Sequence, residues 1–93
     1  MTDATVTRNE DTLAFAGALD RAAVATLWLQ AQTLLAGVRR LDLSAVTRVD
    51  SAGLALLAEL AARIDGVTVT GRPDGLDELR AAYRLQDDLS FAA

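Results

Sequence analysis

Residues 41–60, LDLSAVTRVDSAGLALLAEL, constrain the fold most strongly, because the hydrophobic pattern changes within them. The apolar residues of 38–43 form a run of strand length, whereas those of 52–64 recur at the spacing of a helix. The polar sequence Asp-Ser-Ala-Gly at 50–53 separates the two patterns and is typical of a helix start. We interpret 44–49 as a loop. The stretch therefore predicts a strand that leads through a short connection into a helix.

The same change of pattern occurs on both sides of this stretch. Residues 5–8 and 12–16 flank the polar sequence Asn-Glu-Asp and predict a hairpin. A helix follows, for which Asp20 is a natural N-cap and Gly37 a natural end. Residues 67–70 alternate as a strand does. The remaining predicted elements are a third helix that contains Leu76, Leu79 and Tyr83, and a short strand near 89–91.

The order strand, strand, helix, strand, helix, strand, helix indicates an α/β fold with a mixed sheet. A strand, a crossover helix and a second strand form a unit with parallel strands, whereas the hairpin at the beginning is antiparallel. In such units the start of each helix lies at the carboxyl edge of the sheet, where α/β proteins place their sites. We therefore expect Asp50 and Ser51 at the functional edge of a single domain that spans residues 1–93.

Composition excludes several classes of function. The net charge of −4 argues against nucleic acid, because binding to phosphates depends on clustered cations. The chain has no cysteine and no histidine, which excludes thiolate metal sites and removes the usual general base. Without a histidine to activate Ser51, we expect no enzyme, and we expect no metal or other cofactor. The adjacent carboxylates Asp87 and Asp88 are interpreted as solvated tail residues rather than a cation site.

Hydropathy indicates a chain without direct membrane insertion. The longest apolar stretches fall far short of the roughly 20 residues that cross a bilayer. The first residues, MTDATVTRNED, also lack the charged and then apolar pattern of a signal peptide. We therefore expect a cytoplasmic protein that reaches a membrane only through a partner.

Two interpretations of the junction at 50–53 remain open at this point. In the first, Asp50 or Ser51 is simply an N-cap, and Gly53 allows close packing in the first helical turn. In the second, the Ser51 hydroxyl is exposed at the positive end of the helix dipole, as a contact for a partner protein or an acceptor for phosphate. Phosphate there would add about two negative charges beside Asp50 and so change what can bind.

The junction resembles the signature of STAS domains, in which a strand is followed by Asp-Ser-Ser/Thr-Gly-Leu. Asp50, Ser51, Gly53 and Leu54 match this pattern, whereas Ala52 replaces a second hydroxyl residue. The sequence TLAFAGALD before the first predicted helix is similar to the second strand of the family and its Gly-x-Leu-Asp turn. The resemblance implies a STAS-like α/β domain, with a mixed four- to five-stranded sheet and about three helices packed mainly on one face.

One branch of the family is most similar, namely the small cytoplasmic STAS subunits of Mla-type phospholipid ABC transporters in Gram-negative bacteria. The matching features are Asp-Thr-Leu-Ala at 11–14, Gly-Ala-Leu-Asp at 17–20, and Trp28. The resemblance implies that Ser51 contacts the ATPase subunit of the transporter, which in turn holds the permease, in a system that maintains outer-membrane lipid asymmetry. The alternative is an anti-sigma-factor antagonist whose Ser51 is phosphorylated by an anti-sigma factor that acts as a serine kinase.

Other side chains are candidates for the same docking surface. Arg48 lies two residues before Asp50, and Arg80 and Arg84 of the third predicted helix would frame Ser51 if that helix lies beside the second. Trp28 is either a partner anchor or part of the core, and its place on an apolar stripe favours the core. The complete set of expected partner-binding residues is Arg48, Asp50, Ser51, Ala52, Gly53, Leu54, Arg80, Tyr83 and Arg84.

Overall fold

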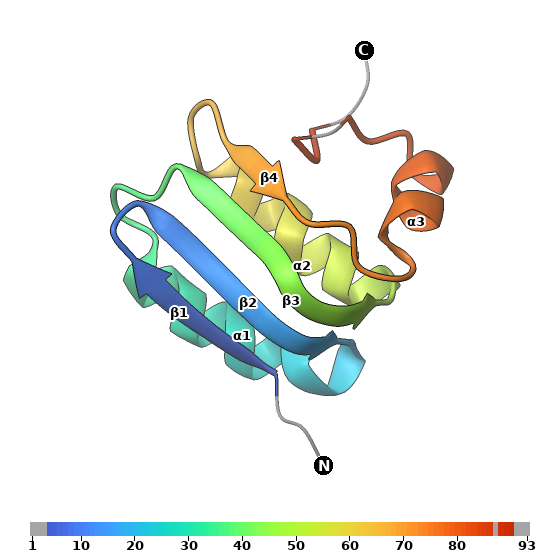
Figure 1. The fold of residues 1–93 in the computed structure, drawn as a ribbon, viewed down its shortest axis with the longest axis horizontal. Helices are drawn as coiled ribbons and strands as arrows, with labels where there is room; N and C mark the ends of the chain where they lie inside the picture. The colour runs from blue at the N-terminus through green and yellow to red at the C-terminus, as the bar shows by residue number, and fades with distance from the viewer. Residues whose placement is uncertain (1–3, 87, 91–93) are drawn as a thin grey trace.

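A four-stranded mixed sheet forms the centre of the molecule in this computed structural model, which describes residues 4–86 and 88–90 (Figure 1). The strands lie in the order in which they occur in the chain. They are β1 (Thr5–Asn9), β2 (Thr12–Leu19), β3 (Arg40–Val49) and β4 (Thr68–Thr70). The helices are α1 (Arg21–Leu34), α2 (Ser51–Ala62) and α3 (Leu76–Ala82). The predicted order of elements is confirmed over the seven elements in the described part of the chain.

The strand directions follow from the connections. The tight turn after Asn9 makes β1 and β2 an antiparallel hairpin, whereas α1 and α2 are the crossovers that make β2, β3 and β4 parallel. Both crossovers step in the same direction along the sheet, so both helices cover the same face (Figure 1). The predicted α/β fold, with a mixed sheet and helices on one face, is confirmed.

The core lies between the sheet and these two helices. Along β2 the side chains of Leu13, Phe15 and Leu19 point toward the helices and are buried, whereas the alanines between them are half-buried. Leu57 and Leu60 of α2 are fully buried against them. Burial of each such side chain contributes about 1.5–3 kcal/mol to folding, so this layer holds α2 and its first turn in place.

The structure corrects the interpretation of residues 44–49 as a loop, because they form the second half of β3. The register between β2 and β3 shifts twice, so β3 uses ten residues where β2 uses eight. The buried positions of β3 are therefore Leu41, Leu43, Val46 and Val49, which do not alternate with a period of two. This irregular spacing, together with the polar residues between the buried positions, concealed the strand.

The predicted strand near 89–91 is wrong for the residues that can be assessed. Leu89 is buried and has a φ of 67°, which is outside the extended region, and neither it nor Ser90 belongs to a strand. Phe91 lies outside the described residues. The other predicted elements differ from the structure only at their ends, where α2 begins at Ser51 and ends at Ala62.

Candidate functional site

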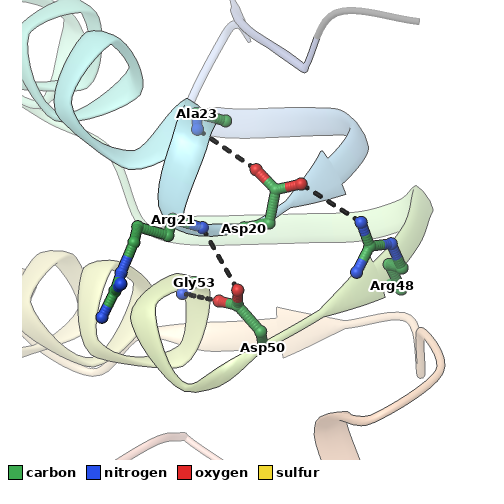
Figure 2. Close-up of polar contacts among 6 residues, drawn as sticks. All are labelled: Asp20, Arg21, Ala23, Arg48, Asp50 and Gly53. Carbon is green, nitrogen blue, oxygen red and sulfur yellow. Dashed lines mark hydrogen bonds and ion pairs between the residues drawn. The ribbon is translucent and has the colours of Figure 1, made fainter.

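The carboxyl ends of β2 and β3 place two helix starts side by side. Leu19 and Val49 are partners in the register of the two strands, and each strand leads through a single aspartate into its helix. Asp20 is the N-cap of α1 and Asp50 is the N-cap of α2. The carboxylates therefore lie at the same edge of the sheet, as the order of elements predicts (Figure 2).

The Asp50 carboxylate contacts both helices. Its Oδ1 accepts a hydrogen bond of 2.9 Å from the backbone N–H of Gly53 in α2, and its Oδ2 accepts one of 3.2 Å from the backbone N–H of Arg21 in α1 (Figure 2). The Gly53 hydrogen bond is the largest of the causes that hold the pKa of Asp50 below its ordinary value, since N–H donors stabilise the charged form. Asp50, and not Ser51, is therefore the cap of α2.

Asp20 makes a second carboxylate contact beside this one. Its Oδ1 accepts from the N–H of Ala23 at 3.2 Å, and its Oδ2 lies 3.2 Å from Nη2 of Arg48. The Arg48 side chain is 61% exposed, so the ion pair contributes little to stability, about 0–1 kcal/mol. Arg48 lies near the junction as expected, but it projects from strand β3 and binds the cap of α1.

Gly53 is explained by the close approach of α2 to the end of β2. A Cβ atom at this position would lie 2.0 Å from the backbone oxygen of Leu19, which is far inside van der Waals contact. The N–H of Asp50 donates to the same oxygen at 3.2 Å. The first turn of α2 is therefore pressed against the backbone of β2, and only glycine fits there.

Ser51 is the first residue of α2 and is exposed. It lines an apolar groove of about 200 Å³ between α2 and the chain at the end of α3. Tyr83, a residue that is 52% exposed, lines the groove from the end of α3. The groove is lined by Ser51, Leu54, Ala55, Ala58, Tyr83 and Leu85.

The predicted site residues divide into those that meet at this groove and those that do not. Leu54 lines the groove although it is buried, and Ala52 is half-buried in the same first turn. Arg80 lines a different hollow with Gly71 and Leu76 and pairs with Asp77 at 3.4 Å.

Arg84 is exposed, follows Tyr83 directly and has a φ of 56°. The partner-binding role of all these residues stays a prediction.

Sequence reasoning missed Ala55 and Ala58, which line the groove from α2. Their spacing of three residues on the outer side of a helix was the available signal, since small side chains there leave room for another chain. It also missed the Arg21 contact. That contact uses a backbone N–H, which no side-chain pattern reveals.

Trp28 packs against the core from α1 and is half-buried. The guanidinium of Arg63 lies 5.1 Å from the centre of its ring, so the indole is covered on that side by a cation. Within residues 4–86 and 88–90, no cluster of carboxylates has the arrangement of a metal site. None of the helices in that part of the chain combines the length and the apolar character needed to cross a bilayer.

Comparison with known proteins agrees with this fold. The family model described as the MlaB type of STAS domain matches residues 3–90. The chain is 40% identical over 83 residues to the intermembrane phospholipid transport system binding protein MlaB of Escherichia coli K12, with 85% of this chain and 86% of that protein covered. The MlaB protein of Shigella flexneri matches equally well. The chain belongs to the STAS domain family, in its MlaB branch.

Proposed function

We propose that this protein is a non-catalytic subunit of an intermembrane phospholipid transporter, which binds the ABC ATPase subunit through the start of α2. The observation that carries the proposal is the exposed Ser51 beside an apolar groove with an exposed Tyr83. An exposed tyrosine beside an apolar groove is typical of protein-binding surfaces, because tyrosine is enriched among the residues that contribute most to binding. Both relatives are named as binding proteins of an intermembrane phospholipid transport system, which agrees with such a role.

In this function the protein would act in the cytoplasm, held at the inner membrane by the ATPase and, indirectly, by the permease. It would support the assembly and activity of the complex and so contribute to the lipid asymmetry of the outer membrane. It would need no cofactor, because it would act by binding another protein and stabilising the active conformation of that protein.

A second function is favoured by one feature of the site. Ser51 is exposed directly after Asp50 at a helix start, as a serine that accepts phosphate would be. An anti-sigma-factor antagonist would bind a serine kinase in its free form and release it after phosphorylation, because about two added negative charges would face the Asp50 carboxylate.

Affinity purification from solubilised inner membranes separates the two functions. The transporter proposal expects recovery of an ABC ATPase together with its permease. Recovery of a kinase-like anti-sigma factor in their place would contradict it and support the phosphorylation switch.

Variants of Ser51 test the contact itself. Ser51→Ala should weaken ATPase binding about three- to tenfold, the usual effect of one lost hydrogen bond. Ser51→Glu should weaken it about a hundredfold or more, because a charge would be buried without a partner. Since Asp50 is the cap, the free energy of unfolding of both variants should lie within about 0.5 kcal/mol of that of the parent.

The matched control is Thr26→Glu, which places the same charge on the exposed side of α1. Binding of the ATPase, measured by titration calorimetry, should be unchanged in this variant. Equal binding by Ser51→Glu and the parent chain would remove Ser51 from the interface.

A further inference from the structure

The starts of α1 and α2 are joined by three contacts between the segments 19–21 and 50–53. The Asp50 N–H donates to the Leu19 oxygen, Gly53 packs against the same backbone, and the Asp50 carboxylate accepts from the N–H of Arg21. The first two contacts involve backbone atoms or a missing side chain. The third is the one that depends on the chemistry of a side chain, and it crosses 29 positions of the sequence.

An ordinary N-cap would satisfy only its own helix. Asp50 does this through Oδ1 and has Oδ2 left over, which serves the first N–H of α1 (Figure 2). Asp20 accepts from the third residue of α1, Ala23, so each of the two carboxylates accepts from one N–H group at that helix start. Asparagine or serine would cap α2 equally well but could not supply a second acceptor oxygen.

We propose that Asp50 is a positioning residue, which sets the Ser51 hydroxyl for docking by fastening the first turn of α2 to the first turn of α1. Asp50 is half-buried and its oxygens are directed at backbone N–H groups, so its role is to hold its neighbour and not to touch the partner. Ser51 follows it directly, so the two hydrogen bonds of Asp50 hold the backbone from which the Ser51 side chain projects. This inference rests on the proposed function, since docking at Ser51 is what the contact serves.

The variant Asp50→Asn tests the inference. The amide oxygen still accepts from Gly53, but an NH₂ group then faces the N–H of Arg21, and the link to α1 is lost. Amide hydrogen exchange, followed by NMR, should become about tenfold faster at Arg21 and remain unchanged at Gly53. Unchanged exchange at Arg21 would show that Asp50 does not hold α1, and would overturn the inference.

The effect of Asp50→Asn on ATPase binding, compared with and without Ser51, distinguishes a positioning role from a purely structural one. Asp50→Asn should weaken ATPase binding about fivefold when Ser51 is present, and less than about twofold in a Ser51→Ala background, because residues that act together are not additive. Equal losses in both backgrounds would overturn the positioning role. They would assign Asp50 an independent effect on binding.

The matched control is Asp42→Asn on the sheet. Asp42 also accepts from a backbone N–H, at 2.9 Å from Ser44, and hydrogen bonds likewise hold its pKa below its ordinary value. This variant should leave ATPase binding unchanged. A loss equal to that of Asp50→Asn would show a general effect of removing a carboxylate, and would also overturn the inference.

The outcomes remain separable from failure of the proposed function. If the parent chain does not bind the ATPase, the proposed function fails, and the docking role of Asp50 fails with it. If the parent binds and the losses are additive, only the positioning role fails.

Discussion

The two ends of the sheet fasten their helices with opposite charges. At the carboxyl edge, the Ser51 end, Asp20 and Asp50 accept hydrogen bonds from N–H groups at helix starts. At the other edge, the Arg8 end, the Arg8 guanidinium donates to the carbonyl oxygen of Leu34 at 2.8 Å and to that of Ala36. Each charge complements the helix dipole that it meets, since helix starts are partly positive and helix ends partly negative.

The difference between the ends lies in what the fastening leaves exposed. The Arg8 side chain reaches back over the end of α1 and also donates to the Glu10 oxygen at 2.8 Å, so its donors are directed at the protein's own backbone. At the Ser51 end the carboxylates are also directed inward, but Ser51 and Tyr83 face outward at a groove. The comparison teaches that a charged side chain at a helix end can be directed at the protein's own backbone while the neutral residue beside it is left exposed.

Gly53→Ala should destabilise the Ser51 end and have the largest effect of these variants on the free energy of unfolding. The added methyl group would meet the backbone of Leu19, which cannot rotate away as a side chain can, so the free energy of unfolding should fall by about 3 kcal/mol. Chemical denaturation measures this change. The control Gly66→Ala has open space around the new Cβ and only the strain of a φ of 62°, and should cost about 1 kcal/mol. Equal costs would show that the close approach is not tight.

Arg8→Ala should destabilise the Arg8 end, with a smaller effect on the free energy of unfolding. Loss of the donors to the end of α1 should lower the free energy of unfolding by about 1–2 kcal/mol. The neighbouring exposed Arg39→Ala serves as the control and should change it by less than about 0.5 kcal/mol. ATPase binding should be unchanged in Arg8→Ala. A large loss of binding would place the docking surface at the Arg8 end and contradict the proposed contact at Ser51.

Arg63→Ala tests a weaker contact between α1 and α2 nearer the Arg8 end. Stacking on Trp28 and an exposed pair with Glu59 together should contribute less than about 1 kcal/mol. Because Trp28 is the single tryptophan of the chain, its fluorescence should report the loss of the cation directly. Arg63→Lys keeps a cation and should shift the emission less; an identical shift in both variants would exclude the stacking contact.

Acid should act on the Ser51 end with the smallest effect. The pKa of Asp50 is lowered from 3.8 in the folded state by its hydrogen bond from Gly53, so its stabilisation is complete above 3.8 and is lost as the pH falls through the folded pKa. The free energy of unfolding of the parent should therefore decline below pH 3.8 more steeply than that of Asp50→Asn. Parallel curves would mean that the carboxylate has the same environment in the folded and unfolded states.

Much of the fold could be predicted because its signals are local. Asp20 is the N-cap of α1 as expected, although the helix ends at Leu34, three residues before the predicted end at Gly37. The spacing of Leu54, Leu57 and Leu60 correctly indicated a buried helix. The second half of β3 could not be predicted in this way. Its residues belong to a strand because β2 pairs with them across two register shifts, and pairing with a distant partner leaves no regular pattern in the strand itself.

The sequence by itself determined the order of the elements, the family and the place of Ser51 at a helix start, because periodicity and capping act over a few neighbouring residues. The tertiary structure decided which aspartate oxygen meets which helix, where Arg80 points and which residues share the groove with Ser51. Asp50 and Arg21 are 29 positions apart. Ser51 lies at the start of α2, whereas Tyr83 lies at the end of α3. The first pair meets because parallel strands bring the starts of α1 and α2 to one edge, and the second because the end of α3 packs beside α2. No local spacing encodes either arrangement.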